Sequence, residues 1–599
     1  MQVVREHRDD LIVRVRILSA VITGILVVIA IGFWFVQLVQ GSYYRELAEN
    51  NRLRKMPIKA PRGLIYDRNG HLLVENIPSY ALMIDRSRAP HHLDQSLAFA
   101  AGVLGRPVEE LQDIMDRYQD TPVFQPVLLA ENLTLSEVSR IGVQSLEHPE
   151  FEVEVQHLRL YRHGGQTASV LGYLGEVTQD EVERAGGHYL PGDLVGKKGI
   201  EQTYDAVLRG RDGERVVVVD SRGELLEEYG RKPAIPGKDL TLSLDLDLQQ
   251  EAARQLDGPE KVGAIIAMEP HTGEILAMVS SPSYNPNLFS HRLQKSDWQA
   301  LLDDPNHPLQ NRVIQNTYSP GSTFKIVMAT AGLTERVVEP HSRTFCTGSA
   351  TFYGRPFRCW KKGGHGSVEA ETAIKGSCDV YFYGVGQRLG IDRIAKYARL
   401  FGLGSATGID IHGEKRGLVP DMEWSLKSRK MPWYPGETIS VAIGQGPILM
   451  TPLQMAVLTS MVANGGYRVT PHLVRDAKVP APQRVPLDED AIKIVHKGMW
   501  DVVNDPSGTA YAAHVPGADV AGKTGTVQVI AQAQRLTAKA LPFKYRDHAW
   551  FTSFAPVDNP KIAVVVFAEH GGSGAHTAAP IAQALYAKYF KVDLHPATR

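Results

Sequence analysis

The chain has 599 residues, with 65 Lys and Arg side chains against 66 Asp and Glu side chains and a formal net charge of −1. This length is too great for one compact core, so two or three domains are expected, and the balanced charge argues against a dedicated nucleic-acid-binding protein. Hydrophobic residues make up 43% of the chain and only three cysteines are present, which excludes wholesale disorder and a disulfide scaffold.

The first predicted element is an apolar helix over residues 17–36, which contain no charged side chain. At about 1.5 Å per residue this run crosses a bilayer core of about 30 Å, and Trp34 lies near one end, where interfacial aromatic residues gather. A cleaved signal peptide is the alternative, but its apolar core is shorter and ends at a small-residue cleavage site. We therefore expect a cytoplasmic tail at residues 1–16, an uncleaved membrane anchor at 17–38, and the remaining residues on one side of the membrane.

Residues 39–235 form a mixed, loop-rich region. Residues 62–70 are typical of two strands joined by an Asn-Gly turn, and residues 107–118 and 135–143 have the periodicity of amphipathic helices. No metal-ligand spacing or nucleophile pattern occurs here, so this region is interpreted as a pedestal, a spacer or interaction module. Pro and Gly cluster at 233–238 and indicate a domain boundary.

Residues 240–590 are expected to form the second soluble domain, followed by a short tail at 591–599. Its first and last parts each contain a hairpin pattern, and helical patterns precede the first hairpin and follow the second. The expected elements are a helix at 246–256, strands at 262–268 and 274–280, strands at 550–555 and 562–568, and a helix at 580–590. This order favours an α+β fold in which helices flank an antiparallel sheet.

A Ser-x-x-Lys motif, Ser322 to Lys325, stands where Pro320 and Gly321 precede an apolar run, so a helix is expected to begin there. The serine and the lysine would then lie on the same face of the helix. A desolvated lysine can lose its proton and act as the base for such a serine. Roughly one or two matches to this motif arise by chance in a chain of this length, so the motif needs companions.

The second motif is Lys523-Thr524-Gly525-Thr526 within a strand pattern. The Lys523 ammonium and the hydroxyls of Thr524 and Thr526 can hold a carboxylate, the Thr526 amide can donate to an oxyanion, and Gly525 allows a close approach to the backbone. The alternative is an edge strand protected by a lysine.

The third motif, Ser377-Cys378-Asp379, lies between the other two. Ser377 can relay a proton to a leaving group, and Asp379 can orient Lys325 or a substrate amide. Either residue would also serve as a helix N-cap, which is the simpler interpretation of the motif taken alone. The three motifs in this order make coincidence improbable.

With these motifs the chain resembles the penicillin-recognising serine acyl-transferases, and nearly its whole length is similar to the class B penicillin-binding proteins of the elongation type. Asp379 departs from the Asn that is usual in the family, but the elongation subgroup often has Asp there. The other segments that carry the resemblance are Arg62-Gly63, Asp67-Arg68-Asn69-Gly70, Gly199-Ile200-Glu201, Tyr204, Leu208-Arg209-Gly210, Gly402-Leu403-Gly404, Thr407-Gly408-Ile409-Asp410, Trp433-Tyr434-Pro435-Gly436-Glu437, Gly444-Gln445-Gly446 and Thr451-Pro452-Leu453-Gln454.

The resemblance implies a D,D-transpeptidase that cross-links peptidoglycan stem peptides during cell elongation and is a target of β-lactams. Ser322 would attack the D-Ala-D-Ala carbonyl, and Lys325 and Ser377 would relay the proton to the leaving D-Ala. Lys523 and the two threonines of its motif would hold the terminal carboxylate, and no metal is needed for this chemistry.

The resemblance also implies an inner-membrane protein with one span and a periplasmic catalytic domain. Its expected partner is a membrane glycosyltransferase of the SEDS class, contacted through residues 17–39 and the pedestal. The alternatives are a bifunctional class A synthase, a β-lactamase or β-lactam sensor, and a non-catalytic scaffold that regulates a polymerase. The first needs a glycosyltransferase domain for which the pedestal is too short, and the intact motifs argue against the last.

All three cysteines, Cys346, Cys359 and Cys378, fall in one short segment together with His365. The spacing lacks the compact Cys-x2-Cys unit of common zinc modules, but three thiolates and an imidazole suit a closed tetrahedral zinc site. The cysteines could instead form one disulfide with an odd thiol, or stay unpaired and buried. We predict a structural zinc held by these four residues, with His365 as the residue that distinguishes the alternatives.

Overall fold

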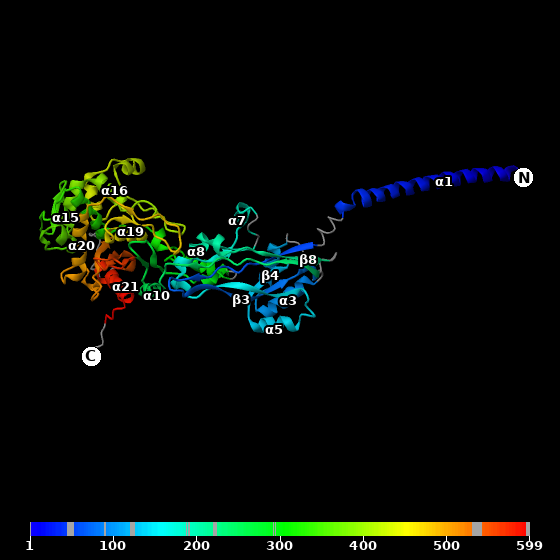
Figure 1. Ribbon diagram of the computed structural model, residues 1–599, viewed down its shortest axis with the longest axis horizontal. Coiled ribbons are helices and arrows are strands. Elements are labelled where there is room, and N and C mark those ends of the chain that lie inside the picture. Colours follow the sequence, from blue (N-terminus) through cyan, green and yellow to red (C-terminus); the bar gives the residue numbers. More distant parts are fainter. Residues whose placement is uncertain are drawn as a thin grey trace. The chain divides into compact units, whose positions relative to one another are not determined.

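The computed structural model describes residues 2–44, 53–88, 92–119, 126–186, 189, 192–219, 225–290, 293, 295–529 and 542–594 (Figure 1). The chain divides into two compact units that are each discontinuous in sequence. The first comprises Met1–Pro61, Ser79–Gln156 and Gly210–Pro236; the second comprises Arg62–Pro78, His157–Arg209 and Gly237–Arg599. The linear domain ranges expected from the sequence stay predictions, and the end of the expected tail, 595–599, lies outside the described residues.

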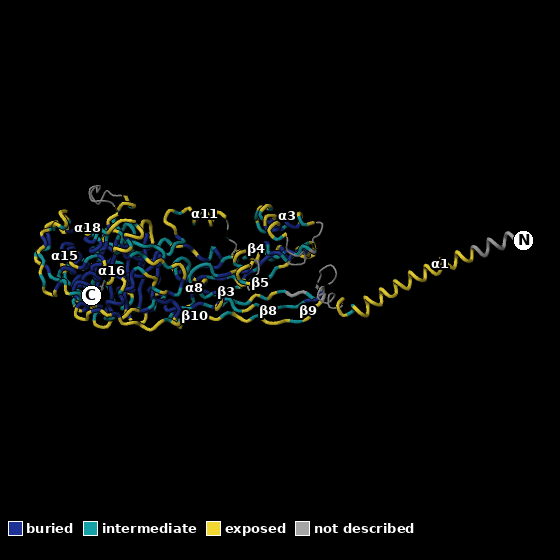
Figure 2. The backbone as a smooth tube through the Cα atoms, turned by 90° about the horizontal axis from the view of Figure 1, so that it is seen from above, coloured by how far each residue is buried: buried dark blue, intermediate teal, exposed yellow. Residues whose placement is uncertain are grey.

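The N-terminal helix α1 spans Gln2–Trp34 and continues as a short π-helical turn, Phe35–Val39. Among the described residues, Leu11–Val39 is the one helical stretch long and apolar enough to cross a membrane, with a mean hydropathy of 2.5. The side chains from residue 11 on are exposed along almost the whole helix (Figure 2). Length and apolar surface agree with the expected anchor.

Besides α1, the described residues of the first unit include a three-stranded sheet and the helices α3, α4 and α5. Strands β1 (Leu53–Ile58), β8 (Gly213–Val219) and β9 (Leu225–Lys232) form an antiparallel sheet in the order β1-β8-β9. The expected helices are confirmed as α4 (Val108–Arg117) and α5 (Leu135–Val143). Together with α3 (Leu93–Leu104), they pack near β4 (Val127–Leu133) around a separate hydrophobic core.

Within the second unit, residues 62–78 and 157–209, which belong to the expected pedestal range, are joined by a buried cluster of charged side chains. The expected Asn-Gly hairpin is confirmed: β2 (Ile65–Tyr66) pairs antiparallel with the start of β3 (Leu72–Ile84). Glu201 is wholly buried and accepts hydrogen bonds from Arg62 at 2.7 Å and Arg159 at 2.8 Å. The two guanidinium groups compensate the desolvation of the carboxylate and lower its pKa against the effect of burial.

The main sheet of the second unit has five antiparallel strands in the order β12-β11-β21-β20-β19. Both expected hairpins are confirmed, and β11 joins them by pairing with β21, although the two strands lie almost 300 residues apart in the sequence. The strands are β11 (Gly263–Met268), β12 (Ile275–Ser281), β19 (Ala521–Val527), β20 (His548–Ala555) and β21 (Ile562–Ala568).

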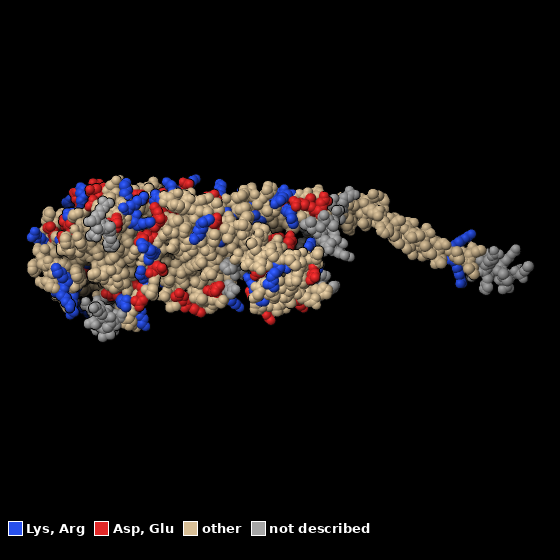
Figure 3. Space-filling view, turned by 90° about the horizontal axis from the view of Figure 1, so that it is seen from below, with Lys and Arg blue, Asp and Glu red and all other residues tan. Residues whose placement is uncertain are grey.

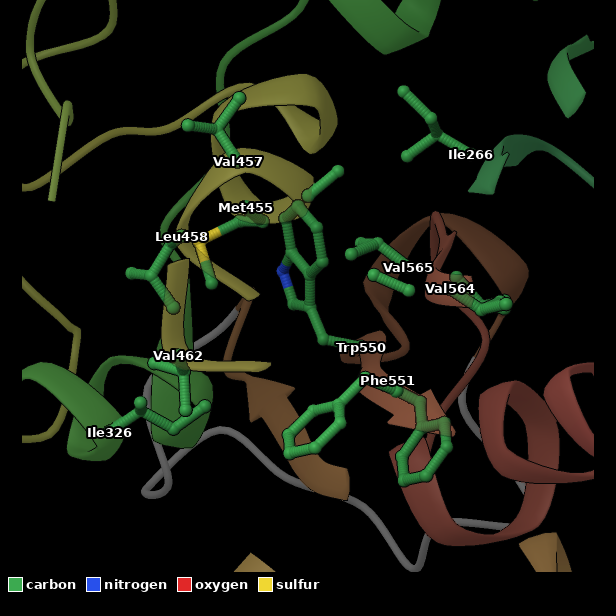
Figure 4. Packing of buried hydrophobic residues seen from close by; sticks show 14 of the residues in the cluster. Ile266, Ile326, Met455, Val457, Leu458, Val462, Trp550, Phe551, Val564 and Val565 are labelled. Carbon is green, nitrogen blue, oxygen red and sulfur yellow. The ribbon is translucent and has the colours of Figure 1, made fainter. Parts of the chain in front are cut away.

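Helices cover this sheet, and the fold is α+β as expected. Helices α10 (Leu246–Gln255) and α21 (Ala579–Phe590) pack against each other and against the sheet, and α19 (Pro452–Ala463) packs on β11, β20 and β21. The indole of Trp550, which is wholly buried, lies beside Met455 and Leu458 of α19 (Figure 4). Every residue of β11 and β21 is buried, which explains their continuous apolar sequence.

A helical layer and a small insertion complete the second unit. The helices are α12 (Arg312–Gln315), α13 (Lys325–Thr334), α14 (Ala370–Lys375), α15 (Asp379–Leu389), α16 (Ile391–Leu400) and α20 (Glu489–Asn504). Between α13 and α14 the chain forms two short antiparallel pairs: β13 (Thr344–Cys346) with β16 (Gly366–Val368), and, nested between them in the sequence, the hairpin of β14 (Ser349–Phe352) and β15 (Arg355–Arg358). Basic and acidic side chains mingle on the face shown in Figure 3, in keeping with the balanced composition.

Candidate active site

Ser322 lies on a 3₁₀ turn, Gly321–Phe324, that leads directly into α13. The helix expected from the sequence therefore begins as a tighter turn, with Lys325 as the first α-helical residue. Gly321 has φ +54° and donates its amide to the carbonyl of Gly444 at 2.9 Å. A Cβ atom on Gly444 would lie 2.1 Å from the Gly321 carbonyl oxygen, so the two backbones touch where no side chain fits. This contact fixes the turn that presents Ser322, which is half-buried.

Lys325 is wholly buried, and its ammonium group has three hydrogen bonds. It donates to the Ser377 carbonyl at 2.9 Å, to the Ser377 hydroxyl at 3.1 Å and to Asp379 Oδ1 at 2.6 Å. Asp379 therefore contacts Lys325 directly, and its orienting role stays a prediction. Among the described residues, Lys325 makes no hydrogen bond to Ser322, the serine for which we expect it to act as the base. The carboxylate is the stronger partner for a buried ammonium, and hydrogen bonds of catalytic groups often tighten only when substrate binds.

Ser377 and Asp379 do not serve as helix caps. The N-cap of α15 is Cys378, whose side chain makes no capping hydrogen bond. Ser377 is buried and has φ +53°, a left-handed conformation that is uncommon for a residue other than glycine and that turns its carbonyl and hydroxyl toward Lys325. The second carboxylate oxygen of Asp379 accepts a hydrogen bond from the Trp360 amide at 2.8 Å. The N-cap interpretation of the motif is therefore wrong.

Lys523 lies on β19, the edge strand of the main sheet, and is wholly buried rather than exposed like a protective edge lysine. Its ammonium donates to the Thr524 carbonyl at 3.1 Å. Burial lowers the pKa of Lys523 well below its ordinary value, and the nearby charge of Lys325 lowers it further. Lys325 and Lys523 are thus close enough to interact electrostatically.

The outer edge of β19 runs along the turn that carries Ser322. A Cβ atom on Gly525 would lie 3.1 Å from the Pro320 carbonyl oxygen, and one on Gly321 would lie 3.1 Å from the Thr526 carbonyl oxygen. Thr526 is exposed on this strand, whereas the buried hydroxyl of Thr524 donates to Thr509 at 3.1 Å. The structure thus brings the three motifs together.

Sequence reasoning missed Trp360. Its amide bonds Asp379, and its indole Nε1 donates to the carbonyls of Gly376 and Ser377, each at 3.1 Å. Trp360 therefore holds the same Ser-x-Asp segment that holds Lys325. The sequence shows only a tryptophan that follows Cys359, and this pattern does not point to such a role.

The four predicted metal ligands also converge, beside the active site. One ligand atom from each of Cys346, Cys359, His365 and Cys378 lies within 4.8 Å of the others, and all three cysteines are buried and free. His365 Nδ1 is 3.8 Å from the Cys346 sulfur and 3.5 Å from the Cys359 sulfur, so the imidazole faces the cysteines. The disulfide alternative is contradicted, because no two of these cysteines are bonded.

The chemistry of this ligand set fits a closed tetrahedral zinc site. His365 Nε2 lies 2.9 Å from the Gly376 carbonyl oxygen, a contact that fixes the ring and leaves Nδ1 for a ligand. Hydrogen bonding between two of the thiols lowers the pKa of Cys359 and raises that of Cys378. The group lies next to Ser377 and Asp379 along the chain, where it can stiffen their loop.

Comparison with known proteins adds independent findings. Residues 263–587 match the model of the penicillin-binding protein transpeptidase domain, and residues 57–242 match that of the penicillin-binding protein dimerisation domain. The chain is 38% identical to the peptidoglycan D,D-transpeptidase MrdA of Acinetobacter baumannii, over 93% of this chain and 85% of that relative. It is 34% identical to MrdA of Escherichia coli K12, over 92% of this chain and 90% of that relative.

Solved structures of penicillin-binding proteins also resemble this chain. The penicillin-binding protein PBP2 of Helicobacter pylori, solved in a complex with MreC, superposes with a TM-score of 0.81 at 29% identity and covers 90% of this chain and 99% of that one. The PBP2 of Pseudomonas aeruginosa in complex with WCK 5153 is 33% identical, with a TM-score of 0.67, and covers 90% of this chain and 98% of that one.

Proposed function

Because this chain belongs to the penicillin-binding protein transpeptidase family, within its PBP2 branch, we infer that it is a peptidoglycan D,D-transpeptidase. The observation that carries the inference is the meeting of three motifs in one site. Ser322 stands on a fixed turn, Lys325 is bound to Ser377 and Asp379, and β19 with Lys523 runs alongside. This is the arrangement of a serine nucleophile, a base with its orienting groups, and a carboxylate-binding strand.

The reaction that we propose is a two-step acyl transfer. The Ser322 oxygen attacks the carbonyl carbon of the penultimate D-Ala, and the peptide bond to the terminal D-Ala breaks as the serine ester forms. The serine proton passes through Lys325 and the Ser377 hydroxyl to the amine of the departing D-Ala. An amine of a neighbouring stem peptide then attacks the ester, the new amide bond forms the cross-link, and Ser322 regains its proton.

Two features of the site support these roles. The Ser377 hydroxyl lies 3.1 Å from Lys325 Nζ, so the relay needs no large rearrangement. Lys523 is buried and, among the described residues, has no carboxylate in contact, so a substrate carboxylate would supply the missing counter-charge. β-Lactams present a carboxylate at the same place, and acylation of Ser322 by a β-lactam follows from the same chemistry. The lifetime of the acyl-enzyme separates a transpeptidase from a β-lactamase. A β-lactamase would hydrolyse the ester and release the drug quickly, whereas a transpeptidase is expected to stay acylated.

Labelling with a fluorescent penicillin tests the proposal. The purified chain is expected to become covalently labelled, and Ser322→Ala is expected to abolish the labelling. Ser319→Ala is the matched control: it changes a serine of the same segment but keeps the Ser319 carbonyl that accepts the Trp550 indole hydrogen bond. Undiminished labelling of Ser322→Ala would remove the serine from the mechanism.

We further propose that α1 anchors the protein in the inner membrane, with the catalytic unit in the periplasm, and that it works beside a SEDS-class glycosyltransferase. Two solved relatives support an assembly of this kind: one was solved with MreC, and another belongs to a peptidoglycan synthase complex that coordinates polymerisation and crosslinking. The second of these covers 98% of this chain, at 31% identity with a TM-score of 0.73.

We also propose a structural zinc ion, bound by Cys346, Cys359, His365 and Cys378. The convergence of the four ligand atoms supports this proposal. The ion would not touch the substrate; it would hold the loop that carries Ser377 and Asp379.

A further inference from the structure

A cavity of about 320 Å³ lies within the second unit, in a part of the chain that the transpeptidase mechanism does not use. Its walls come from five stretches of the chain: residues 168–169, 197–199 with Gln202, Ser280 with 283–284, 308–311 with 314–315, and 411–413. Two lysines, Lys197 and Lys198, line it, and none of the described lining residues is Asp or Glu. The volume is that of a site for a small organic molecule.

The two lysines differ in whether a carboxylate of the described residues pairs with their charge. Lys197 is paired with Glu181, whose carboxylate lies 2.5 Å from its ammonium. Lys198 is half-buried and donates to the carbonyl of Leu309 at 2.7 Å, and it has no carboxylate within ion-pair distance among the described residues. Burial lowers the pKa of Lys198, with no acidic neighbour to oppose the effect. One carbonyl satisfies one of its three N–H groups.

The other polar side chains in the wall are rich in unused hydrogen-bonding capacity. Gln310 and His412 make no side-chain hydrogen bond to the described residues. Gln315 accepts from the Asn311 amide, and its own NH₂ group lies where a Cβ atom on Gly413 would be only 2.7 Å away. A single unpaired cation surrounded by neutral amides matches a ligand with one negative charge and further polar groups.

We propose that this cavity, the Lys198 pocket, binds a small monocarboxylate whose carboxylate pairs with the Lys198 ammonium and whose amide or hydroxyl groups meet the surrounding glutamines. The shared chemistry is a carboxylate next to hydrogen-bonding groups, and it has two sources at hand: the carboxyl end of a short peptide, or a sugar acid. The alternative is that Lys198 only tethers the Leu309 segment.

Calorimetric titration of the full-length protein tests the proposal with two matched pairs of probes. N-Acetyl-D-alanine is compared with its neutral amide, and N-acetylmuramic acid with neutral N-acetylglucosamine. Benzylpenicillin first occupies the active site, so that binding there does not contribute. We expect at least one acid to bind and its neutral counterpart to bind at least about tenfold more weakly. Equal binding of acid and neutral partner, or no binding of either acid at about 10 mM, would overturn the proposal.

Two variants locate the binding. Lys198→Met, which keeps the length of the side chain, is expected to weaken binding of the acid at least about tenfold. Lys197→Met is the matched control and is expected to change it less than about twofold, because that charge is already paired with Glu181. Unchanged affinity in Lys198→Met would show that the lysine is only a tether.

A third measurement uses the unmodified chain, in case Lys198→Met does not fold. The acid probe is expected to protect Lys198, but not Lys197, from acetylation by acetic anhydride, as read by peptide mass spectrometry. Equal labelling of Lys198 with and without the probe would overturn the proposal. The Lys198 pocket does not depend on the proposed function: a failure of benzylpenicillin to acylate the protein would count against the transpeptidase, while the variants would still report on the pocket.

Discussion

The lowered pKa of Lys523 affects how the proposed reaction depends on pH. Burial and the Lys325 charge lower the pKa of Lys523, so its ammonium loses its proton at a lower pH than a free lysine does. The neutral amine cannot pair with the substrate carboxylate. The contribution of Lys523 to binding is therefore present at low pH and is lost as the pH rises through the lowered pKa. In stability the sign is opposite, because the buried ammonium is unfavourable: raising the pH through this window favours the folded state.

We predict an alkaline limb in the rate of β-lactam acylation, with its midpoint below the ordinary lysine pKa of about 10.4. Lys523→Arg keeps its proton throughout this range, so the variant should be slower at neutral pH but should lose less of its rate on the alkaline side. Stopped-flow acylation from about pH 6 to about pH 10 measures both profiles. Identical alkaline limbs would assign the titration to another group.

At this scale the sequence identified the residues but not their contacts. Ser322, Lys325, Ser377, Asp379 and Lys523 were found because each belongs to a short pattern of reactive residue types. The pairing of Lys325 with Ser377 and Asp379, rather than with Ser322, depends on the left-handed backbone of Ser377. Trp360 acts through its backbone amide and indole on a segment that follows it after sixteen intervening residues, and no periodicity encodes such a contact.

At the scale of elements, two loops decide the geometry of the site: the turn at Gly321 and the turn at Gly444. We predict that Gly444→Ala lowers both the melting temperature and the acylation rate, because its Cβ atom would lie 2.1 Å from the Gly321 carbonyl oxygen. The overpacking should cost about 1–3 kcal/mol, in addition to about 1–2 kcal/mol for a non-glycine residue at positive φ.

Gly446→Ala is the matched control for this variant. Gly446 belongs to the same motif and also has positive φ, +82°, but a Cβ atom there would meet nothing closer than 3.8 Å. It should therefore show the backbone penalty alone and keep its acylation rate. If both variants acylate equally fast, the Gly321–Gly444 contact does not position Ser322.

The insertion with β13–β16 gives a second prediction at this scale. We expect about one zinc ion per chain by elemental analysis, a lower melting temperature after chelation, and loss of the metal in Cys359→Ser. His341→Ala is the control, because this exposed histidine lies in the same insertion but outside the cluster. A protein that carries no metal and melts at the same temperature with and without chelator would contradict the zinc site.

Elements with strong local patterns were predicted well. The hairpins β2–β3, β11–β12 and β20–β21 and the helices α4, α5, α10 and α21 all follow their periodicity or turn residues. The small strands β13–β16 were not predicted, because they are three or four residues long and their packing involves the cysteine cluster rather than an alternating pattern. The 3₁₀ turn at Ser322 was not predicted either, because close backbone contact with Gly444 sets it.

For the whole molecule, the sequence predicted an α+β chain with one anchor helix, and the family comparison and the fold agree. The sequence could not predict which segments of the chain belong to each compact unit. Residues 62–78 and 157–209 belong to the second unit, although they lie within the expected pedestal range. The contacts that decide this, such as Arg62 and Arg159 with Glu201, join segments more than forty residues apart and leave no local signal.

The anchor carries a prediction about assembly. Exchange of residues 1–39 for an unrelated membrane span should keep the protein membrane-bound and fully labelled by penicillin but weaken its co-purification with the SEDS-class partner. Removal of residues 1–39 should make the protein extractable without detergent. Undiminished co-purification after the exchange would place the partner contact elsewhere on the chain.

The central claim is that this chain forms peptidoglycan cross-links through an acyl-enzyme. The most direct measurement supplies the purified full-length protein with uncross-linked glycan strands that bear D-Ala-D-Ala stems and analyses the digested product by mass spectrometry. We predict cross-linked stem dimers together with an equal amount of released D-Ala, both absent after benzylpenicillin treatment and in Ser322→Ala. Release of D-Ala without dimers, or dimers formed by Ser322→Ala, would contradict the account.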